Sequence, residues 1–520
     1  MPLIRALARA TFGAGVVSIV AMGCGARSPL QPCRTDADCN SIDLCAKFSC
    51  VFDQKLHDLA CQIVQKTNCD DSDPCTTDSC NKSTGACENV HVSLDVDGDG
   101  HRAPLPDGTC GDDCDDTDPR AFPGNKEVCD GVDNDCDGIV DNGASYIPLA
   151  NADFQLSKPG FEWAAPDSFR RGSVTGSVNL MSTYDASQSG QLTPFLQPLD
   201  ALGKPALDPS ILTGTDAAGS GTSLAWTGDR FGISWSDRRD GNYEIYFALL
   251  DATGKKMAPG DERITVSQGF SIYPSLVWTG LEFVIAWQEE KSSGDFKLQA
   301  QRLGIDGRLV GNIATLTAGN ADEQGPTLVS GKTELGLVWV HRTDTLQSIT
   351  FQPFNFDLTG LASSPQPITL TKPAMSAADP MLAYDKKNDR YIAAFYDASP
   401  TNRTVYGTVV SKTGVVVPAT DIAQSPAQSR DPALLALGDR VLFVYADDRD
   451  KNSGYELYAH TLSADLSTDI APPFRVTNAP GDSINPILAF ASNGSVLVLF
   501  RDDRGPQPAV FETALQCLMP

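Results

Sequence analysis

The sequence predicts a mainly β chain, and three observations support this prediction. Residues 144–520 contain many apolar stretches of five to eight residues separated by Gly, Asp and Asn, a pattern typical of short strands. These stretches recur with a period slightly above 50 residues, and no long amphipathic helix pattern interrupts them. The preceding part of the chain is rich in Cys and Asp and poor in large apolar side chains. We therefore predict a seven-bladed, alternatively six-bladed, β-propeller preceded by a disulfide-rich stalk and an Asp-rich calcium-loop segment.

Length and charge narrow the class of protein further. With 520 residues, a formal charge of -26 and 20% charged residues, the chain is long enough for two or three domains. A charge this negative argues against nucleic acid, whose phosphates would repel the protein, and favours cations as partners.

Residues 1–23 have the pattern of a bacterial secretory signal peptide. Arg5 and Arg9 precede an apolar run of about a dozen residues, which small residues follow. This run is too short for a stable membrane span, and no later apolar run reaches membrane length. The letters AMG before Cys24 suit ordinary signal peptidase, and they also resemble a lipobox, in which the cysteine is lipidated. Removing a lipid-modified Cys24 leaves 14 of the 15 cysteines, an even number that suits disulfides.

Residues 24–90 are expected to form a cysteine-rich stalk. Nine cysteines follow Cys24 at short spacings, as in CRTDADCNSIDLCAKFSC, and large apolar side chains are few. Such a segment cannot fold on a hydrophobic core and needs covalent links. Zinc is the alternative for closely spaced cysteines, but the scarcity of histidine and the export signal favour disulfides. These runs resemble the cysteine-rich repeats of bacterial surface lipoproteins.

Residues 91–143 concentrate negative charge, with 15 acidic side chains against three basic ones. Two stretches, LDVDGDGHRA and GVDNDCDGIVDNG, each place three aspartates two residues apart and follow them with glycine. In a calcium loop of the EF-hand type, positions 1, 3 and 5 supply oxygens, glycine at 6 permits the turn, and position 7 offers its backbone carbonyl. The predicted metal ligands are Asp95, Asp97, Asp99 and His101 in the first loop, and Asp133, Asp135, Asp137, Ile139 and Asp141 in the second.

The position that normally closes an EF-hand loop departs from this pattern, because Pro106 and Asn142 stand where a carboxylate is usual. The loops therefore look more like the helix-poor calcium repeats of thrombospondin type 3. The alternative is a solvated acidic spacer held by its four cysteines. Repulsion among so many carboxylates would oppose compaction without cations or water to screen it.

The run DVDGDGHRAPLPDGTCGDDCDDTDPRAFPGNKEVCDGVDNDCDGIVD closely resembles the MopE-type metal-binding motif of bacterial surface proteins. Its CDDTDP, PG, E-x-CDG and DNDCDG elements follow in that order over about 47 residues. The resemblance implies a bound metal. Hard oxygen ligands, with no free thiols or clustered imidazoles, favour Ca²⁺ over copper or zinc. Copper binding by the namesake is not carried over to any residue of this chain.

Residues 144–520 contain six aligned repeats, such as YPSLVWTGLEFVIAWQEEKSSG and NPILAFASNGSVLVLFRDDRG, and a weaker copy at about 179–214. Five prolines and one threonine share one position, at spacings of 52, 52, 54, 52 and 54 residues. Each repeat predicts an inner strand after the proline, a second strand ending in an aromatic residue, then a third and a fourth. The shared position is Thr222, Pro274, Pro326, Pro380, Pro432 and Pro486, and the aromatic residues are Trp235, Trp287, Trp339, Phe395, Tyr445 and Phe500.

The aromatic residues are expected to pack one blade against the next rather than to bind a ligand. The last repeat ends one strand short, after PAVFETALQ, whereas residues 146–157 form an orphan strand. We therefore expect residues 146–157 to complete the final blade and close the ring.

Catalysis has little support in the sequence. The clusters SDRRD (236–240), DDRD (447–450) and RDDR (501–504) recur at one repeat position, as structural turn residues do. The chain has five histidines and lacks a sialidase Asp-box, a Gly-x-Ser-x-Gly elbow and a Walker loop. We predict a cell-surface or secreted calcium-binding protein whose propeller binds a glycan or protein partner without catalysis. The alternative is a secreted glycosidase or lyase with its active site in the propeller channel.

The signal peptide and Cys24 predict the localisation. We expect an outer-membrane lipoprotein that faces the cell surface and is held by a lipid anchor only, or a secreted protein.

The disulfide prediction pairs Cys110 with Cys114 and Cys129 with Cys136. If Cys24 is lipidated, the odd stalk cysteine is left for Cys517, which would lock the ring closed. The competing pairing joins Cys517 to Cys129 or Cys136.

Overall fold

The structure is a computed structural model. It describes residues 32–39, 43–54, 56–93, 95–105, 109–128, 132–139, 145–148, 153–156, 172–175, 180–188, 191–200, 204–213, 219–292, 294–317, 321–344, 346–363, 366–399, 403–450, 454–490, 494–505 and 508–518. The signal peptide and Cys24 lie outside these residues. No helix within the described ranges is long and apolar enough to cross a membrane.

The chain divides into two compact units. The first comprises Met1–Val96 with Gly100–Asp112, and the second comprises Asp97–Asp99 with Asp113–Pro520.

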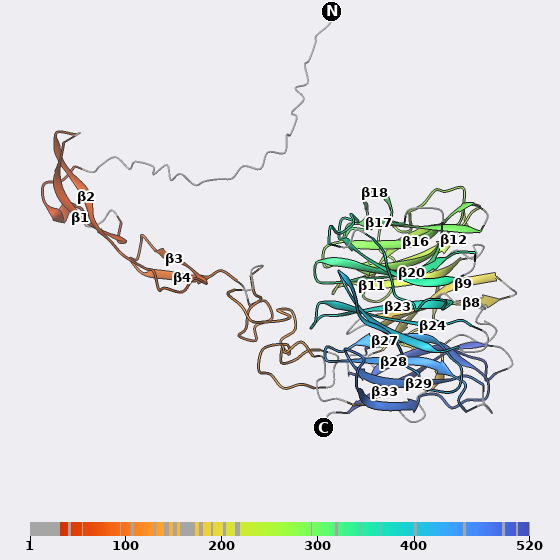
Figure 1. The fold of residues 1–520 in the computed structure, drawn as a ribbon. Coiled ribbons are helices and arrows are strands. Elements are labelled where there is room, and N and C mark those ends of the chain that lie inside the picture. The colour runs from red at the N-terminus through yellow and green to blue at the C-terminus, as the bar shows by residue number, and fades with distance from the viewer. Residues whose placement is uncertain are drawn as a thin grey trace, which may run out of the picture. The chain divides into compact units, whose positions relative to one another are not determined.

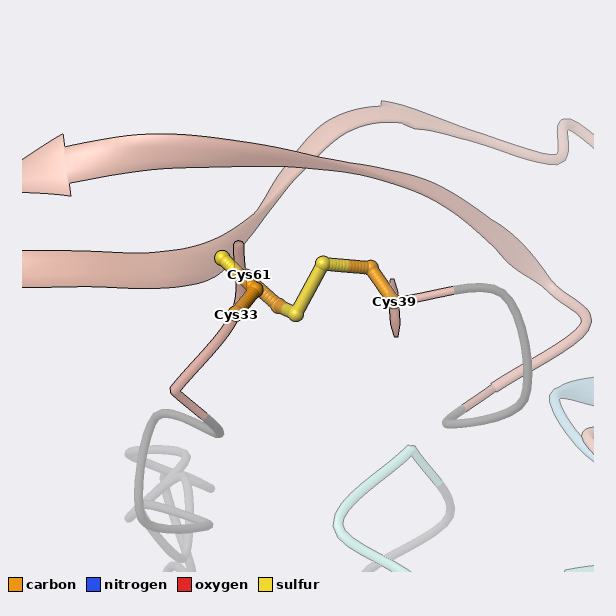
Figure 2. Close-up of side chains that lie close together, drawn as sticks. All are labelled: Cys33, Cys39 and Cys61. Atoms are coloured by element: carbon orange, nitrogen blue, oxygen red, sulfur yellow. A yellow bond between two sulfur atoms is a disulfide. The ribbon is translucent and has the colours of Figure 1, made fainter. Parts of the chain in front are cut away.

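Two hairpins and a short 3-10 helix are the regular elements among the described residues of the first unit. Its buried cluster consists of cysteines, with Phe48 packed against them, so disulfides replace a hydrophobic core. Figure 2 shows the disulfide between Cys39 and Cys61, with Cys33 close by. The elements are η1 (Asp36–Cys39), β1 (Ala46–Asp53) paired with β2 (Asp58–Lys66), and β3 (Thr76–Cys80) paired with β4 (Cys87–His91).

The prediction that this segment is disulfide-bonded is confirmed, because all nine stalk cysteines are bonded. The pairing predicted for the Asp-rich segment is wrong. Cys110 bonds to Cys75 rather than to Cys114, and Cys136 bonds to Cys114. The nearest cysteines in sequence do not pair because backbone folding decides which Cα atoms come within bonding range. The bonds are Cys33–Cys50, Cys39–Cys61, Cys45–Cys80, Cys69–Cys87, Cys75–Cys110 and Cys114–Cys136.

The second unit is a succession of antiparallel sheets, which confirms the mainly β prediction (Figure 1). In spatial order, the first four sheets are β7 (Gly172–Thr175), β8 (Leu180–Gln188), β9 (Gln191–Leu199) and β10 (Ser210–Ile211); β11 (Gly219–Trp226), β12 (Arg230–Asp237), β13 (Glu244–Asp251) and β14 (Glu262–Arg263); β15 (Ser271–Trp278), β16 (Phe283–Ser292), β17 (Asp295–Leu303) and β18 (Leu309–Thr315); and β19 (Asp322–Ser330), β20 (Glu334–Arg342), β21 (Gln347–Asn355) and β22 (Ile368–Thr369). The next two are β23 (Ala377–Asp385), β24 (Arg390–Asp397), β25 (Val405–Ser411) and β26 (Gly414–Asp421); and β27 (Ser429–Ala436), β28 (Arg440–Asp447), β29 (Glu456–Ser463) and β30 (Asp469–Arg475).

The last sheet joins the chain that precedes the other six sheets to the chain that follows them. Its strands are β31 (Ser483–Phe490), β32 (Val496–Asp502) and β33 (Ala509–Leu518), and β33 pairs with both β5 (Ser145–Pro148) and β6 (Phe154–Gln155). The prediction that residues 146–157 supply the missing outer strand is therefore confirmed over these two strands. The pairing covers the edge that β33 would otherwise expose.

Each repeated proline lies in a bulge of the first strand rather than before it. In β15 the register shifts between Ile272 and Ser275, around Pro274. Proline has no N–H to donate to the strand ladder, and a bulge is where the ladder needs none. The predicted strand starts were therefore too late by a few residues. The residue before the shared position has positive φ in all six repeats: Gly221, Tyr273, Gly325, Asp379, Asp431 and Asn485.

The first strands of consecutive sheets contact one another, and β31 contacts β7. Apolar clusters fill the spaces between neighbouring sheets. The repeated aromatic residues are buried in these spaces, since Trp235, Phe395 and Tyr445 are 0% exposed. Their expected packing role is confirmed.

Cys517 lies on β33 opposite Tyr146 and is disulfide-bonded. The predicted bond from Cys517 to a stalk cysteine is wrong, because the stalk cysteines from Cys33 to Cys87 are bonded elsewhere. Cys24 and Cys129, the remaining two cysteines of the chain, lie outside the described residues.

Candidate metal centre

Three carboxylates from two separate stretches of sequence come together in the Asp-rich segment. Asp97, Asp99 and Asp113 each bring one oxygen within 4.8 Å of the others. Asp97 and Asp99 are half-buried, whereas Asp113 is only 2% exposed. We call these three residues the first carboxylate cluster.

Asp113 is the most informative member of this cluster. Its Oδ1 accepts a hydrogen bond from the backbone N–H of Asp115 at 2.8 Å, but within the described residues no donor reaches its buried Oδ2. Burial raises the pKa of Asp113, and the negative charges of Asp99 and Asp97 raise it further. A buried carboxylate facing two others is stabilised by taking up a proton or by binding a cation.

A second carboxylate cluster consists of Glu127, Asp133 and Asp135, whose oxygens also lie within 4.8 Å of one another. Glu127 is 6% exposed, and its Oε1 accepts a hydrogen bond from the N–H of Asp135 at 3.0 Å. The described structure offers no hydrogen-bond donor to the buried Oδ1 of Asp133. Burial raises the pKa of Asp133, and the charges of Asp137 and Asp135 add to that shift.

The same hydrogen bond shapes both predicted loops. The first aspartate accepts from the N–H of the glycine five residues later, from Gly100 to Asp95 at 3.2 Å and from Gly138 to Asp133 at 2.8 Å. Both glycines have positive φ, 100° and 89°, where a side chain would be strained. The turn that the glycine at position 6 was expected to permit is thus present in both loops.

The remaining predicted ligands lie outside the two carboxylate clusters. His101 Nδ1 lies 3.0 Å from Asp112 Oδ1, and the exposed Asp137 accepts from the N–H of Ile139 at 2.8 Å. His101 and Ile139 were expected to offer only their backbone carbonyls. Asp141 lies outside the described residues.

Sequence reasoning missed Asp113 and Glu127, which are the most buried carboxylates of the two clusters. Asp113 precedes the CDDTDP element, and Glu127 is the glutamate of the E-x-CDG element. Both elements were recognised as parts of a motif, but neither was assigned a ligand, because the EF-hand frame counts only positions within one loop.

A disulfide joins the two clusters. Asp113 directly precedes Cys114, and Cys136, the partner of Cys114, lies between Asp135 and Asp137. The bond therefore links the backbone at the buried end of the first cluster to the loop of the second.

Within the described residues, the cysteine groups offer no thiolate to a metal. Cys33, Cys39 and Cys61 lie close together (Figure 2), and so do Cys114 and Cys136 with Asp113. All five sulfurs are in disulfides. A disulfide sulfur is not a thiolate, so the donor atoms of the two clusters are carboxylate oxygens. This set fits a hard cation.

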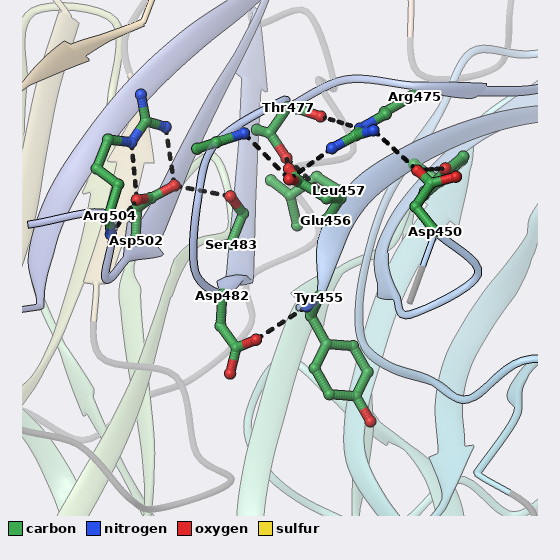
Figure 3. Close-up of polar contacts among 12 residues, drawn as sticks. Asp450, Tyr455, Glu456, Leu457, Arg475, Thr477, Asp482, Ser483, Asp502 and Arg504 are labelled. Carbon is green, nitrogen blue, oxygen red and sulfur yellow. Dashed lines mark hydrogen bonds and ion pairs between the residues drawn. The ribbon is translucent and has the colours of Figure 1, made fainter. Parts of the chain in front are cut away.

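The acidic and basic clusters among the sheets of the second unit have a structural role. Figure 3 shows Asp502, which is 0% exposed, bonded to Arg504 and to Ser483. Asp502 also accepts from the N–H of Arg504 at 2.8 Å, which fixes the turn. Asp237 with Arg239 and Asp447 with Arg449 repeat this arrangement.

A buried glutamate forms a second repeated network beside these turns. Glu456 is 0% exposed and accepts from Arg475 Nη2 and from Thr477 Oγ1, both at 2.6 Å (Figure 3). In another sheet, Glu244 makes the equivalent contacts with Arg263 and Thr265. Recurrence in several sheets and full pairing indicate turn and strand stabilisation.

A protein-family model matches part of the Asp-rich segment. The family described as "Putative metal-binding motif" matches residues 113–142, which include Asp113 and the whole second carboxylate cluster. No curated protein matches the chain.

Several solved structures are similar to this chain over about 70% of its length. A protein of unknown function from Dyadobacter fermentans is 14% identical, covers 72% of this chain and 99% of its own, and has a TM-score of 0.43. The NanB sialidase from Streptococcus pneumoniae is 11% identical, with 72% and 71% covered and a TM-score of 0.40. A subtype N10 neuraminidase-like protein of A/little yellow-shouldered bat/Guatemala/060/2010 is 9% identical, with 71% and 99% covered and a TM-score of 0.37. At these scores the likeness carries no conclusion about activity.

Proposed function

We propose that this protein is a surface-exposed or secreted Ca²⁺-binding protein whose propeller presents a binding surface. The buried Asp113 carries the metal part of this proposal. Its Oδ2 is buried without a donor from the described residues, and one of its two oxygens lies within 4.8 Å of oxygens of Asp97 and Asp99. A cation among these oxygens would replace the hydration that burial removes.

Calcium fits this donor set better than the other common metals. Carboxylate and carbonyl oxygens suit Ca²⁺, whereas Zn²⁺ and copper favour imidazole and sulfur ligands. Titration calorimetry of the disulfide-intact mature chain should show saturable Ca²⁺ binding and weaker binding of Mg²⁺. An absence of binding heat at millimolar Ca²⁺, or a preference for Cu²⁺ over Ca²⁺, would refute the calcium assignment.

We infer that the propeller has seven blades closed into a ring. Seven successive sheets, the contact of β31 with β7, and the pairing of β33 with β5 support this inference. A closed ring has no free sheet edge and holds its connecting loops rigidly, which suits binding of a glycan or protein.

We also propose that Cys24 is lipidated and that Cys517 bonds to Cys129. This pairing accounts for all 14 other cysteines and leaves Cys24 for the anchor. Replacing Cys24 by Ser should release the protein from the membrane fraction and leave the Cys517 bond in peptide maps unchanged. Unchanged membrane partition would refute the anchor, and a bridge between Cys517 and Cys24 would refute both assignments.

The alternative function, a carbohydrate-active enzyme, requires carboxylates that are available to a substrate. Asp237, Asp447 and Asp502 are 0% exposed and paired with arginines, which weighs against them. A glycan panel separates the two functions, because a binding protein shifts its melting temperature with a glycan and leaves that glycan intact. Turnover would favour the enzyme.

A further inference from the structure

The loop of the second carboxylate cluster is packed against the propeller. We call residues 132–139 the cation loop. A Cβ built on Gly438 would lie 2.3 Å from the carbonyl oxygen of Gly138 and 2.7 Å from the Cα of Ile139. A Cβ built on Gly138 would lie 3.3 Å from Lys387 Cγ. The loop thus lies on two turns, between β27 and β28 and between β23 and β24.

Gly438 differs from the glycines at the matching turns of other sheets. Gly228, between β11 and β12, and Gly280, between β15 and β16, also have positive φ, but a Cβ on either would meet nothing within 4 Å. Both are exposed, whereas Gly438 is buried. Turn geometry explains a glycine at all three positions, but only Gly438 is also needed for close approach of another segment.

The carboxylates that would hold a cation also set the shape of the surface that contacts Gly438. Gly138 donates its N–H to Asp133 Oδ2, and its carbonyl oxygen lies against Gly438. Ile139 donates its N–H to Asp137 Oδ1 and contacts the same glycine. Without a cation, repulsion among these carboxylates favours a wider loop, which would fit the turns less well.

We propose that cation binding to the Asp-rich segment and seating of the cation loop on the β27–β28 and β23–β24 turns are thermodynamically coupled. This proposal rests on the proposed Ca²⁺ function. Coupling is reciprocal, so a cation favours the seated loop, and the seated loop raises the affinity for the cation. The two turns of the propeller would then raise the affinity of the metal site without supplying a ligand.

The test compares Gly438→Ala with its matched control Gly228→Ala. Both variants strain a residue of positive φ, but only Gly438→Ala places a methyl group against the cation loop. Calorimetry of each full-length, disulfide-intact variant with Ca²⁺ should show an affinity lower by about 5- to 150-fold for Gly438→Ala. The Ca²⁺ affinity of Gly228→Ala should differ from that of the parent chain by less than about twofold, a smaller change than coupling would produce.

Hydrogen exchange of the parent chain provides a second readout that needs no substitution. Removing Ca²⁺ with EDTA should speed amide exchange at Leu437–Arg440, and leave Thr227–Arg230 unchanged. If the parent chain binds Ca²⁺ and the two variants bind it with equal affinity, the coupling is refuted. Amide exchange at Leu437–Arg440 that EDTA does not change would also refute it. Absence of Ca²⁺ binding by the parent chain would instead refute the proposed function and with it this inference.

Discussion

At the scale of single residues, two buried carboxylates stand out because no basic side chain among the described residues pairs with their charges. Asp113 is 2% exposed and Glu512 is 1% exposed. Asp113 lies among other carboxylates, which fits a metal site. Glu512 lies on β33, at a position where other sheets have Phe247 or Ala459. Their surroundings lead to different predictions.

Replacing Asp113 by Asn should weaken Ca²⁺ binding at the first carboxylate cluster by at least about tenfold. The amide keeps the shape of the side chain but removes the charge that a hard cation needs. Asp115→Asn is the matched control, because Asp115 is exposed and bonds to Thr117. Calorimetry of the full chain measures both, and equal affinities would exclude Asp113 as a ligand.

Glu512 should make the protein less stable as the pH rises. Burial, with a smaller contribution from the charge of Asp200, raises the pKa of Glu512 to about 9 from 4.5. Between these values the folded chain holds a proton that the unfolded chain has lost, so the free energy of unfolding falls with rising pH. At pH 7 the loss is on the order of 3 kcal/mol.

The variant Glu512→Leu removes this titration and should be more stable than the parent chain at pH 8 and similar at pH 4.5. Urea unfolding across this pH range measures the difference, with Glu512→Gln as the variant that removes charge but keeps polarity. A parent and variant with parallel pH profiles would show that Glu512 ionises normally in the folded state.

At the scale of elements, the short strand β5 contributes more to the stability of the fold than its four residues suggest. It pairs with β33 and places Tyr146 in the apolar cluster that contains Leu437, Leu515 and Cys517. Because β5 precedes the repeated sheets and β33 ends them, this pairing connects opposite ends of one long chain segment. Loss of this pairing would expose the edge of β33 and open the apolar cluster that contains Tyr146.

Tyr146→Ala should therefore lower the free energy of unfolding by about 3 kcal/mol, as expected for truncating a buried aromatic side chain. Ile147→Ala on the same strand is the control, because Ile147 is 41% exposed and its loss should cost less than about 0.5 kcal/mol. Urea denaturation gives both values. Equal costs would mean that β5 does not hold the sheet together.

At the scale of the whole molecule, the two units are stabilised by different physics. The first unit has five disulfides that span 17 to 35 residues and a buried cluster made of cysteines. The second unit has large apolar clusters between its sheets. Closing loops of that length stabilises the folded state by about 3 to 4 kcal/mol per disulfide in the chain-entropy model.

A reductant should consequently unfold the first unit and leave the sheets of the second folded. Limited proteolysis in reducing buffer should cut within residues 32–93 while the region 219–490 stays intact. The same digestion without reductant is the control. Survival of residues 32–93 under reduction would show that contacts other than disulfides hold that unit.

The sequence by itself determined the features that depend on local pattern and repetition. Alternating apolar residues fixed the strands, the spacing of Pro274 and its counterparts identified the repeated sheet, and the short final repeat indicated that residues 146–157 complete it. The Asp-x-Asp-x-Asp-Gly pattern located both loops, because glycine at position 6 and the aspartate at position 1 act within a few residues of each other.

Only the tertiary structure decided which distant groups meet. Asp113 joins Asp97 and Asp99, Cys75 bonds to Cys110, and Gly438 receives the cation loop. Each of these contacts links segments that different turns bring together, so no single stretch of sequence contains both halves of the signal. Burial is also decided by the tertiary structure. The low exposure of Asp113 and Glu512 comes from the residues that pack over them and not from their neighbours along the chain.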